Sequence, residues 1–277
     1  MSICLDPARM AAATTYPLRE RVNYAGIFRH LATVDVLPSV VIPTHDNDQA
    51  APVVVADDRS RLSVVAAHVI VIPTFEISSK QDNVPVADLA AVDRAQGKMA
   101  EEIIADEDAV GLMVLDAAAS ECNGRLAGPL SRDILSDAYA EVERHQLIVA
   151  SVVLGEWDYK TMVACMGDQL DRIPSGRHAR SAATIWGADV IVAPGELKGI
   201  YVTTQSQHLA VMPVKQELTV MVTATRQAGF LAFEEVGACV HNPRGVVAID
   251  TGLRQVLSDW DASARKKRND NLRSVFG

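Results

Sequence analysis

The feature that most constrains the fold of this chain is a long helical pattern from Val86 to Ala119. Its apolar residues recur at steps of three, four and seven, which places them on one helix face. They are Leu89, Val92, Met99, Ile103, Val110 and Val114. At about 1.5 Å per residue the helix would be about 50 Å long. Pro85 favours its start and Asn123-Gly124 its end, while Gly97 and Gly111 leave two shorter helices as the alternative.

The region from residue 40 to 79 is rich in β-forming residues. The tetrapeptide Val-Ile-Pro-Thr occurs in it twice, ending at Thr44 and at Thr74. Two valine-rich runs lie between the copies, separated by a polar turn at residues 57–60. Proline at both ends fits edge strands, because proline cannot donate to a central ladder. The pattern predicts a long projecting hairpin, with an ordinary meander packed on the core as the alternative.

The other segments lack the βαβαβ alternation of a doubly wound sheet, so the expected fold class is α+β. Residues 1–39 show no sustained periodicity and predict an extended arm with one short helix near Val22–Leu31. The elements expected after the long helix are a helix at Ser131–His145, a buried strand at Leu147–Leu154, a helix at Glu156–Met166, an exposed loop at Gly167–Ser181, several strands between Trp186 and Ile249, and a frayed tail from about Gly252.

Charge and cysteine content argue against several classes of protein. The formal net charge is −9, whereas a general nucleic-acid binder needs clustered Lys and Arg. The cysteines form no C-x-x-C pair, so no zinc ribbon or thioredoxin-type site is indicated, and we expect reduced thiols. These residues are Cys4, Cys122, Cys165 and Cys239. The N-terminus does not look like a signal peptide, and no apolar run is long enough to span a membrane.

Known catalytic motifs are absent from the sequence. It contains no phosphate-binding loop, dinucleotide fingerprint, H-E-x-x-H helix or G-x-S-x-G elbow, and its seven histidines are dispersed. We therefore assign no catalytic, cofactor-binding or metal-binding residue and expect no cofactor. The alternative of an enzyme would draw its site from Asp189, His208 or His241, which show no converging constellation.

Two groups of acidic residues need a separate interpretation. Glu101-Glu102 and Asp106-Glu107-Asp108 lie in the long helix, and we expect them on a solvated face. Glu234 and Glu235 lie in a presumed strand, where neighbouring side chains point to opposite faces, so they cannot form a catalytic dyad. One of these two glutamates is a candidate for a buried charge partner at a subunit contact.

Three groups of segments carry a family resemblance through their order and spacing. They are Ile72–Ile77 leading into Pro85–Leu89 and the long helix with Leu115–Ala118, Ile185–Val192 followed by Gly199–Val202, and Val211–Val220 followed by Phe233–Gly237. Over about residues 40–250 the chain resembles the HK97-like major capsid proteins of tailed bacteriophages, a family that includes the encapsulin shells. The resemblance implies a structural subunit, not an enzyme, that self-assembles into an icosahedral shell around double-stranded DNA. An encapsulin-like shell around a cargo enzyme is the alternative within the fold.

The resemblance also implies a division of the chain and a set of partners. The ranges are an N-terminal arm at 1–39, an extended loop at 40–79, a peripheral domain with a spine helix at 80–125 and 203–245, an axial domain at 126–202 and 246–252, and a C-terminal tail at 253–277. The expected partners are copies of the chain in hexamers and pentamers, a scaffolding protein and a portal, with non-specific proximity to packaged DNA and no membrane. The expected location is the virion capsid, after assembly in the host cytoplasm.

The chain departs from the family pattern in two respects. Some members join a loop lysine to a neighbour's asparagine, but here no lysine precedes Lys80. We therefore predict a shell without covalent crosslinks. The arm is also too short for the large N-terminal assembly domain of some relatives, which leads to the hypothesis of a separate scaffolding protein.

Overall fold

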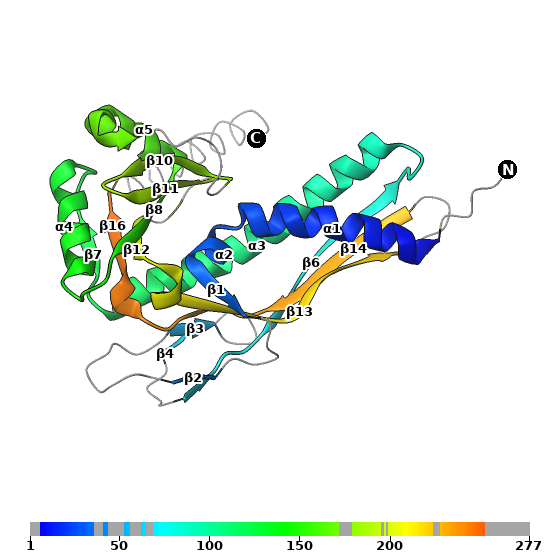
Figure 1. The fold of residues 1–277 in the computed structure, drawn as a ribbon, viewed down its shortest axis with the longest axis horizontal. Coiled ribbons are helices and arrows are strands. Elements are labelled where there is room, and N and C mark those ends of the chain that lie inside the picture. Colours follow the sequence, from blue (N-terminus) through cyan, green and yellow to red (C-terminus); the bar gives the residue numbers. More distant parts are fainter. Residues whose placement is uncertain are drawn as a thin grey trace, which may run out of the picture.

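The long helical pattern forms one continuous helix (Figure 1). The computed structural model describes residues 6–35, 41–43, 53–55, 62–64, 69–171, 179–194, 197, 199–223 and 228–252. Helix α3 (Leu89–Glu121) is 33 residues long, so the alternative of two shorter helices is wrong. Asp88 caps its N-terminus by accepting a hydrogen bond from the N–H of Ala90 at 2.9 Å. The chain leaves the helix through Asn123, whose φ is 56°.

Helix α3 lies along a sheet with three long antiparallel strands. The first sheet has the order β4-β3-β15-β13-β14-β6, and β1 pairs in parallel with β13. Its strands are β1 (Ala32–Asp35), β3 (Val53–Val55), β4 (Leu62–Val64), β6 (Phe75–Val84), β13 (Ala210–Val222), β14 (Ala228–Val236) and β15 (Cys239–Val240). Burial alternates along the start of β6, as expected for a strand with one face on a core. Met99, Ile103 and Leu115 of α3 share that core with Val220 and Phe230 of the sheet.

The inner strand pair of the predicted hairpin is part of the first sheet, whereas the outer pair forms a separate two-stranded sheet. The two expected strand pairs are present: β2 (Val41–Pro43) pairs with β5 (Val69–Val71), and β3 pairs with β4. However, β3 also pairs with β15, and Val53 and Val54 are buried. The inner strand pair therefore does not project freely from this single chain. The predicted polar tip at residues 57–60 lies outside the described residues.

A second sheet lies at the other end of α3 (Figure 1) and has its own core. Its order is β7-β16-β12-β8-β11-β10-β9. These strands are β7 (Arg125–Ala127), β8 (Val149–Gly155), β9 (Leu170–Asp171), β10 (Ser181–Ile185), β11 (Ala188–Ala193), β12 (Ile200–Thr204) and β16 (Val246–Asp250). Helices α4 (Arg132–Glu143) and α5 (Glu156–Met166) confirm the helices predicted in this region, and Ser131 caps α4 by accepting from the N–H of Ile134 at 3.3 Å.

The prediction of an extended N-terminal arm is wrong for the described residues. Residues 7–25 form helix α1 (Pro7–Ala25), which is followed by the short helix α2 (Ile27–Leu31). Asp6 caps α1, and the helix buries Thr14, Leu18 and Val22 at steps of four. This spacing produces a narrow buried stripe, which packs against α3 and β13. The helix therefore packs on the main body of the fold and is not an extended arm.

Candidate functional site

The residues of the enzyme alternative are spread over both sheets. Asp189 lies in β11 of the second sheet, where its charge acts on His30 of α2. His208 is exposed at the end of the 3-10 helix η2 (Ser206–His208). His241 follows β15, and its backbone N–H donates to the carbonyl of Leu209 at 3.1 Å. The segments of His208 and His241 are thus adjacent, while Asp189 belongs to a separate group of charges.

Among the described residues, no group of three or more His, Cys, Asp or Glu side chains could hold a metal ion. Cys122, Cys165 and Cys239 are free thiols. Burial raises the pKa of Cys239 to about 12, so this residue is a packed thiol rather than a thiolate nucleophile. None of the described helices combines the length and apolar character needed to cross a bilayer.

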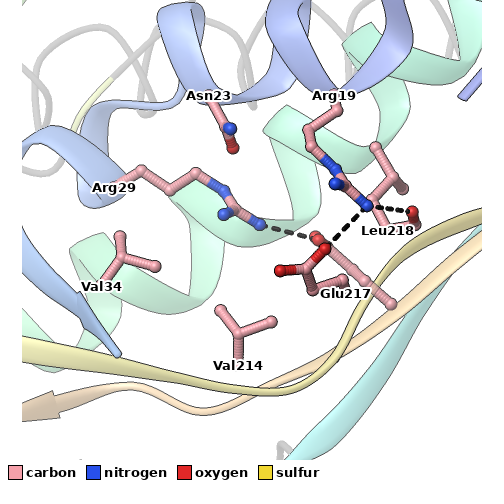
Figure 2. Close-up of a pocket in the computed structure, with 8 residues that line it drawn as sticks. Arg19, Asn23, Arg29, Val34, Val214, Glu217 and Leu218 are labelled. Atoms are coloured by element: carbon pink, nitrogen blue, oxygen red, sulfur yellow. Dashed lines mark hydrogen bonds and ion pairs between the residues drawn. The ribbon is translucent and has the colours of Figure 1, made fainter. Parts of the chain in front are cut away.

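A pocket of about 240 Å³ lies between α1 and β13 (Figure 2). It is lined by Arg19, Asn23, Arg29, Val34, Val214, Glu217, Leu218 and Glu234. At its edge, the Nη2 of Arg19 donates to the carbonyl of Leu218 at 3.1 Å and pairs with the Oε2 of Glu217 at 2.9 Å. The pair is partly exposed and contributes little to stability. Figure 2 shows the side chain of Arg29 extending under α1 toward the carboxylates of the pocket.

The guanidinium of Arg29 joins three elements that are far apart in sequence. Its Nε donates to both carboxylate oxygens of Glu107 in α3, at 2.8 and 2.9 Å, and its Nη2 donates to the Oε2 of Glu234 in β14 at 2.7 Å. All three side chains are at least nine-tenths buried. Burial alone would lower the pKa of Arg29, but the two carboxylates raise it above its ordinary value. Arg29 therefore stays charged and ties α2 to α3 and to the first sheet.

Glu107 and Glu234 together carry more negative charge than Arg29 alone can balance when both are ionised. Burial raises the pKa of Glu107 well above its ordinary value, and the neighbouring Glu234 raises it further, while Arg29 acts in the opposite direction. Two buried carboxylates beside one guanidinium favour the state in which one carboxyl keeps its proton. The pair of glutamates can then share that proton in a hydrogen bond.

The adjacent Asp108 caps helix α2 from the side of α3. Its Oδ1 accepts hydrogen bonds from the backbone N–H groups of Ile27 at 2.7 Å and Phe28 at 3.0 Å, and its Oδ2 lies 3.4 Å from the Nη1 of Arg180. Burial raises the pKa of Asp108 to about 6, although these three partners lower it. A residue on α3 thus supplies the cap that α2 does not obtain from its own chain neighbours.

The expectation that all acids of α3 face solvent is wrong. Glu101, Glu102 and Asp106 are exposed as expected, but Glu107 and Asp108 are buried. The physical reason is the packing of α2, which supplies both the guanidinium and the backbone donors that make burial tolerable. The buried cluster of Arg29, Glu107, Asp108 and Glu234 could not be recognised from the sequence.

The two glutamates of β14 point to opposite faces, as predicted. Glu235 lies on the outer side, where it accepts hydrogen bonds from Lys215 at 2.7 Å and from Thr74 at 2.5 Å. Glu234 is buried on the inner side and pairs with Arg29. The hypothesis that a glutamate of this pair finds its buried charge partner at a subunit contact is wrong for Glu234, because the partner lies in the same chain.

Large apolar side chains are exposed at both ends of the molecule. Helix α3 begins at one end with Leu89, which is 82% exposed, and Met221 near the end of β13 is also exposed. At the other end, beside the second sheet, the exposed apolar residues are Ile148, Trp157 and Val163. Trp157 on α5 is 62% exposed. Clusters of exposed large apolar side chains mark surfaces that bind other proteins.

Comparison of the whole fold with solved structures gives a consistent result. A protein of Microbacterium phage Oxtober96 matches with a TM-score of 0.58 at 12% identity, covering 82% of this chain and 91% of that one. The putative capsid protein of an Escherichia coli CFT073 prophage matches with a TM-score of 0.53 at 9% identity, covering 90% and 100%. The virus-like particle from Pyrococcus furiosus matches with a TM-score of 0.52 at 14% identity, covering 87% and 99%.

These matches rest on structure and not on sequence. No family model matches the sequence, and no curated protein matches it. The likeness to the solved structures nevertheless extends over nearly the full length of each pair of chains. The chain therefore has the α+β HK97-like capsid fold.

Proposed function

We propose that this chain is a shell subunit, a major capsid protein that self-assembles into an icosahedral shell enclosing double-stranded DNA. The observation that supports this proposal most is the fold, whose likeness to the putative capsid protein of a prophage and to a virus-like particle covers 90% and 87% of this chain. A shell depends on the shape of the whole subunit rather than on a few reactive side chains. The lack of catalytic motifs in the sequence is in keeping with such a role.

The exposed apolar residues support repeated contacts between copies of the chain. An elongated subunit has a large surface for its volume and gains burial by packing against neighbours. Leu89 and Met221 at one end, and Trp157 at the other, provide apolar surface for such contacts. Contacts at two separate ends, repeated by symmetry, close a shell from identical subunits.

The parts of the subunit receive the following proposed roles. The second sheet, with α4 and α5, corresponds to the axial domain that surrounds the fivefold and sixfold axes of hexamers and pentamers. The first sheet with α3 corresponds to the peripheral domain and its spine helix. Residues 40–79 correspond to the extended loop that reaches over a neighbour. In an assembled shell this loop would exchange the pairing of β3 with β15 for contacts with another copy.

Electron microscopy of the purified full-length chain tests the proposal. We expect closed or curved polyhedral shells, because the chain carries apolar surface at both ends. A chain that stays a compact monomer at every concentration would contradict the role. We also propose a separate scaffolding protein and a portal as partners. Shells of one uniform size formed by this chain alone would count against the scaffolding protein.

The contents of shells purified from their natural source distinguish DNA packaging from cargo storage. Double-stranded DNA protected from nuclease supports the proposed virion capsid, for which we also propose assembly in the host cytoplasm. A packaged enzyme without DNA supports the encapsulin-like alternative. The net charge of −9 suits an inner wall that lies near packed DNA without binding it tightly.

The shell is expected to contain no covalent crosslinks between subunits. The extended loop has no lysine, since Lys80 is the first in the chain and lies in β6, where it pairs with Asp82 at 3.0 Å. Denaturing electrophoresis of assembled particles should give one band at the mass of the subunit, 29.8 kDa. A ladder of covalent oligomers would contradict this prediction and leave the shell role intact.

A further inference from the structure

Helix α2 is held in place by buried charges together with buried apolar side chains, and not by its length. It has five residues, too few for a stable isolated helix. Gly26, with an extended backbone at φ −67° and ψ 121°, separates it from α1, and β1 follows it directly. Arg29 binds Glu107 and Glu234, while Asp108 caps the first turn. The polar contacts of this junction therefore depend on one guanidinium and three carboxylates, beside the apolar packing of Ile27, Phe28 and Leu31.

Among the residues that the structure describes, the charges around α2 do not balance when all of them are ionised. The facing acids are Glu107 and Asp108 from α3, Glu234 from β14 and Asp189 from β11. The facing bases are Arg29 and His30 of α2 itself and Arg180 in front of β10. Burial lowers the pKa of His30 while Asp189 opposes this. In the described part of the chain, four carboxylates thus face two permanently charged arginines. The further ion pair of Arg19 and Glu217 at the pocket edge has no net charge.

We propose that α2 is a proton-dependent latch, which fixes the junction between α1 and β1 to α3 while the excess carboxyls keep their protons and loosens when they ionise. In the closed latch, Arg29 binds Glu107 and Glu234, and Asp108 caps α2. The latch opens by movement at Gly26, and α1 remains held by its own buried stripe of Leu18 and Val22. This inference concerns the single chain and holds whether or not the chain forms shells.

The direction of the pH effect follows from the raised pKa values of the two acids. A carboxyl whose pKa is higher in the closed latch than in the open one binds its proton more tightly in the closed form. Protonation therefore stabilises the closed form, and this stabilisation is complete at a pH below the ordinary pKa of the group. This stabilisation is lost as the pH rises through the raised value, which is about 6 for Asp108. Glu107 adds to the effect at higher pH, because its pKa is also raised. The latch is therefore tightest in mild acid and loosens toward alkaline pH.

Hydrogen exchange of the full-length chain measures this opening directly. The N–H groups of Ile27 and Phe28 are the probes, because they donate to Asp108. After correction for the intrinsic exchange rate, we expect their protection to fall by about tenfold between pH 5 and pH 8, the change that a shift from 3.8 to about 6 produces. Amides of β14 serve as the internal reference and should keep their protection.

Variants in which the two acids are replaced by uncharged amides distinguish the proposed latch from a general loosening of the protein at alkaline pH. Glu107→Gln/Asp108→Asn keeps the shapes and the accepting oxygens, so its α2 protection should change less than threefold over the same range. Glu101→Gln/Asp106→Asn removes one Glu and one Asp from exposed positions of the same helix and should retain the tenfold fall. Should the double core variant fail to fold, Asp108→Asn alone must reduce the fall. Constant protection in the unaltered chain, or an undiminished fall in the core variants, would overturn the latch.

Discussion

The substitution Phe28→Ala is expected to lower the free energy of unfolding by about 3–5 kcal/mol. The ring of Phe28 is 1% exposed and occupies the space above Gly111 in α3. Truncation would remove buried apolar surface and leave a cavity between α2 and α3. Denaturant unfolding of the chain under non-assembling conditions measures the change. Tyr24→Ala, at a half-exposed position of α1, should change the stability by less than about 0.5 kcal/mol.

The companion substitution Gly111→Ala tests the same contact from the other side. A Cβ at position 111 would lie 2.1 Å from the Cγ of Phe28, so the ring must move, at a cost of about 1–3 kcal/mol. In the double variant the added methyl group partly fills the cavity left by Phe28. We therefore expect the double variant to lose less stability than the two single variants together. Strict additivity would show that the two residues are not in contact.

The substitution Trp157→Glu is expected to reduce shell formation at least about tenfold while the subunit stays folded. Trp157 lies on the outer side of α5 and contributes little to the second core. At a protein interface a tryptophan commonly accounts for about 2 kcal/mol or more of binding free energy, and each contact in a shell is repeated many times. Sedimentation of assembled particles, with circular dichroism of the same sample, measures both quantities.

A matched control distinguishes loss of a contact from added charge. Ala105→Glu introduces the same charge at an exposed position of α3 and should assemble like the unaltered chain. Normal assembly of the Trp157 variant would show that this face of α5 lies outside the contacts of the shell. The shell role itself would then still depend on the microscopy.

Elements with a strong local pattern could be predicted from the sequence. Helices α4 and α5 follow from cap residues and periodic apolar positions, and α3 follows from a stripe long enough to outweigh Gly97 and Gly111. Helix α1 was missed because its apolar stripe has only one residue per turn and Pro17 stands within it. Its start at Asp6-Pro7 was the available signal, since both residues favour a helix N-terminus.

Features that depend on distant segments could not be predicted in this way. The pairing of β3 with β15 joins residues far apart in sequence, and no local pattern specifies it. The buried acids of α3 show the same limit. Glu107 and Asp108 continue the stripe of Ile103 and Ile104, which was a signal of burial. Their charge outweighed that signal, because Arg29 becomes visible as a partner only once α2 is in place.

The order of strands in the second sheet has a consequence for synthesis on the ribosome. Strand β16 lies between β7 and β12, yet it is made more than forty residues after β12. Until residues 246–250 emerge, β7 has no partner and β12 has an open edge. A nascent chain therefore cannot complete the second sheet before nearly all of its residues have been translated. Polysomes of this messenger would therefore carry chains in which the second sheet is still incomplete.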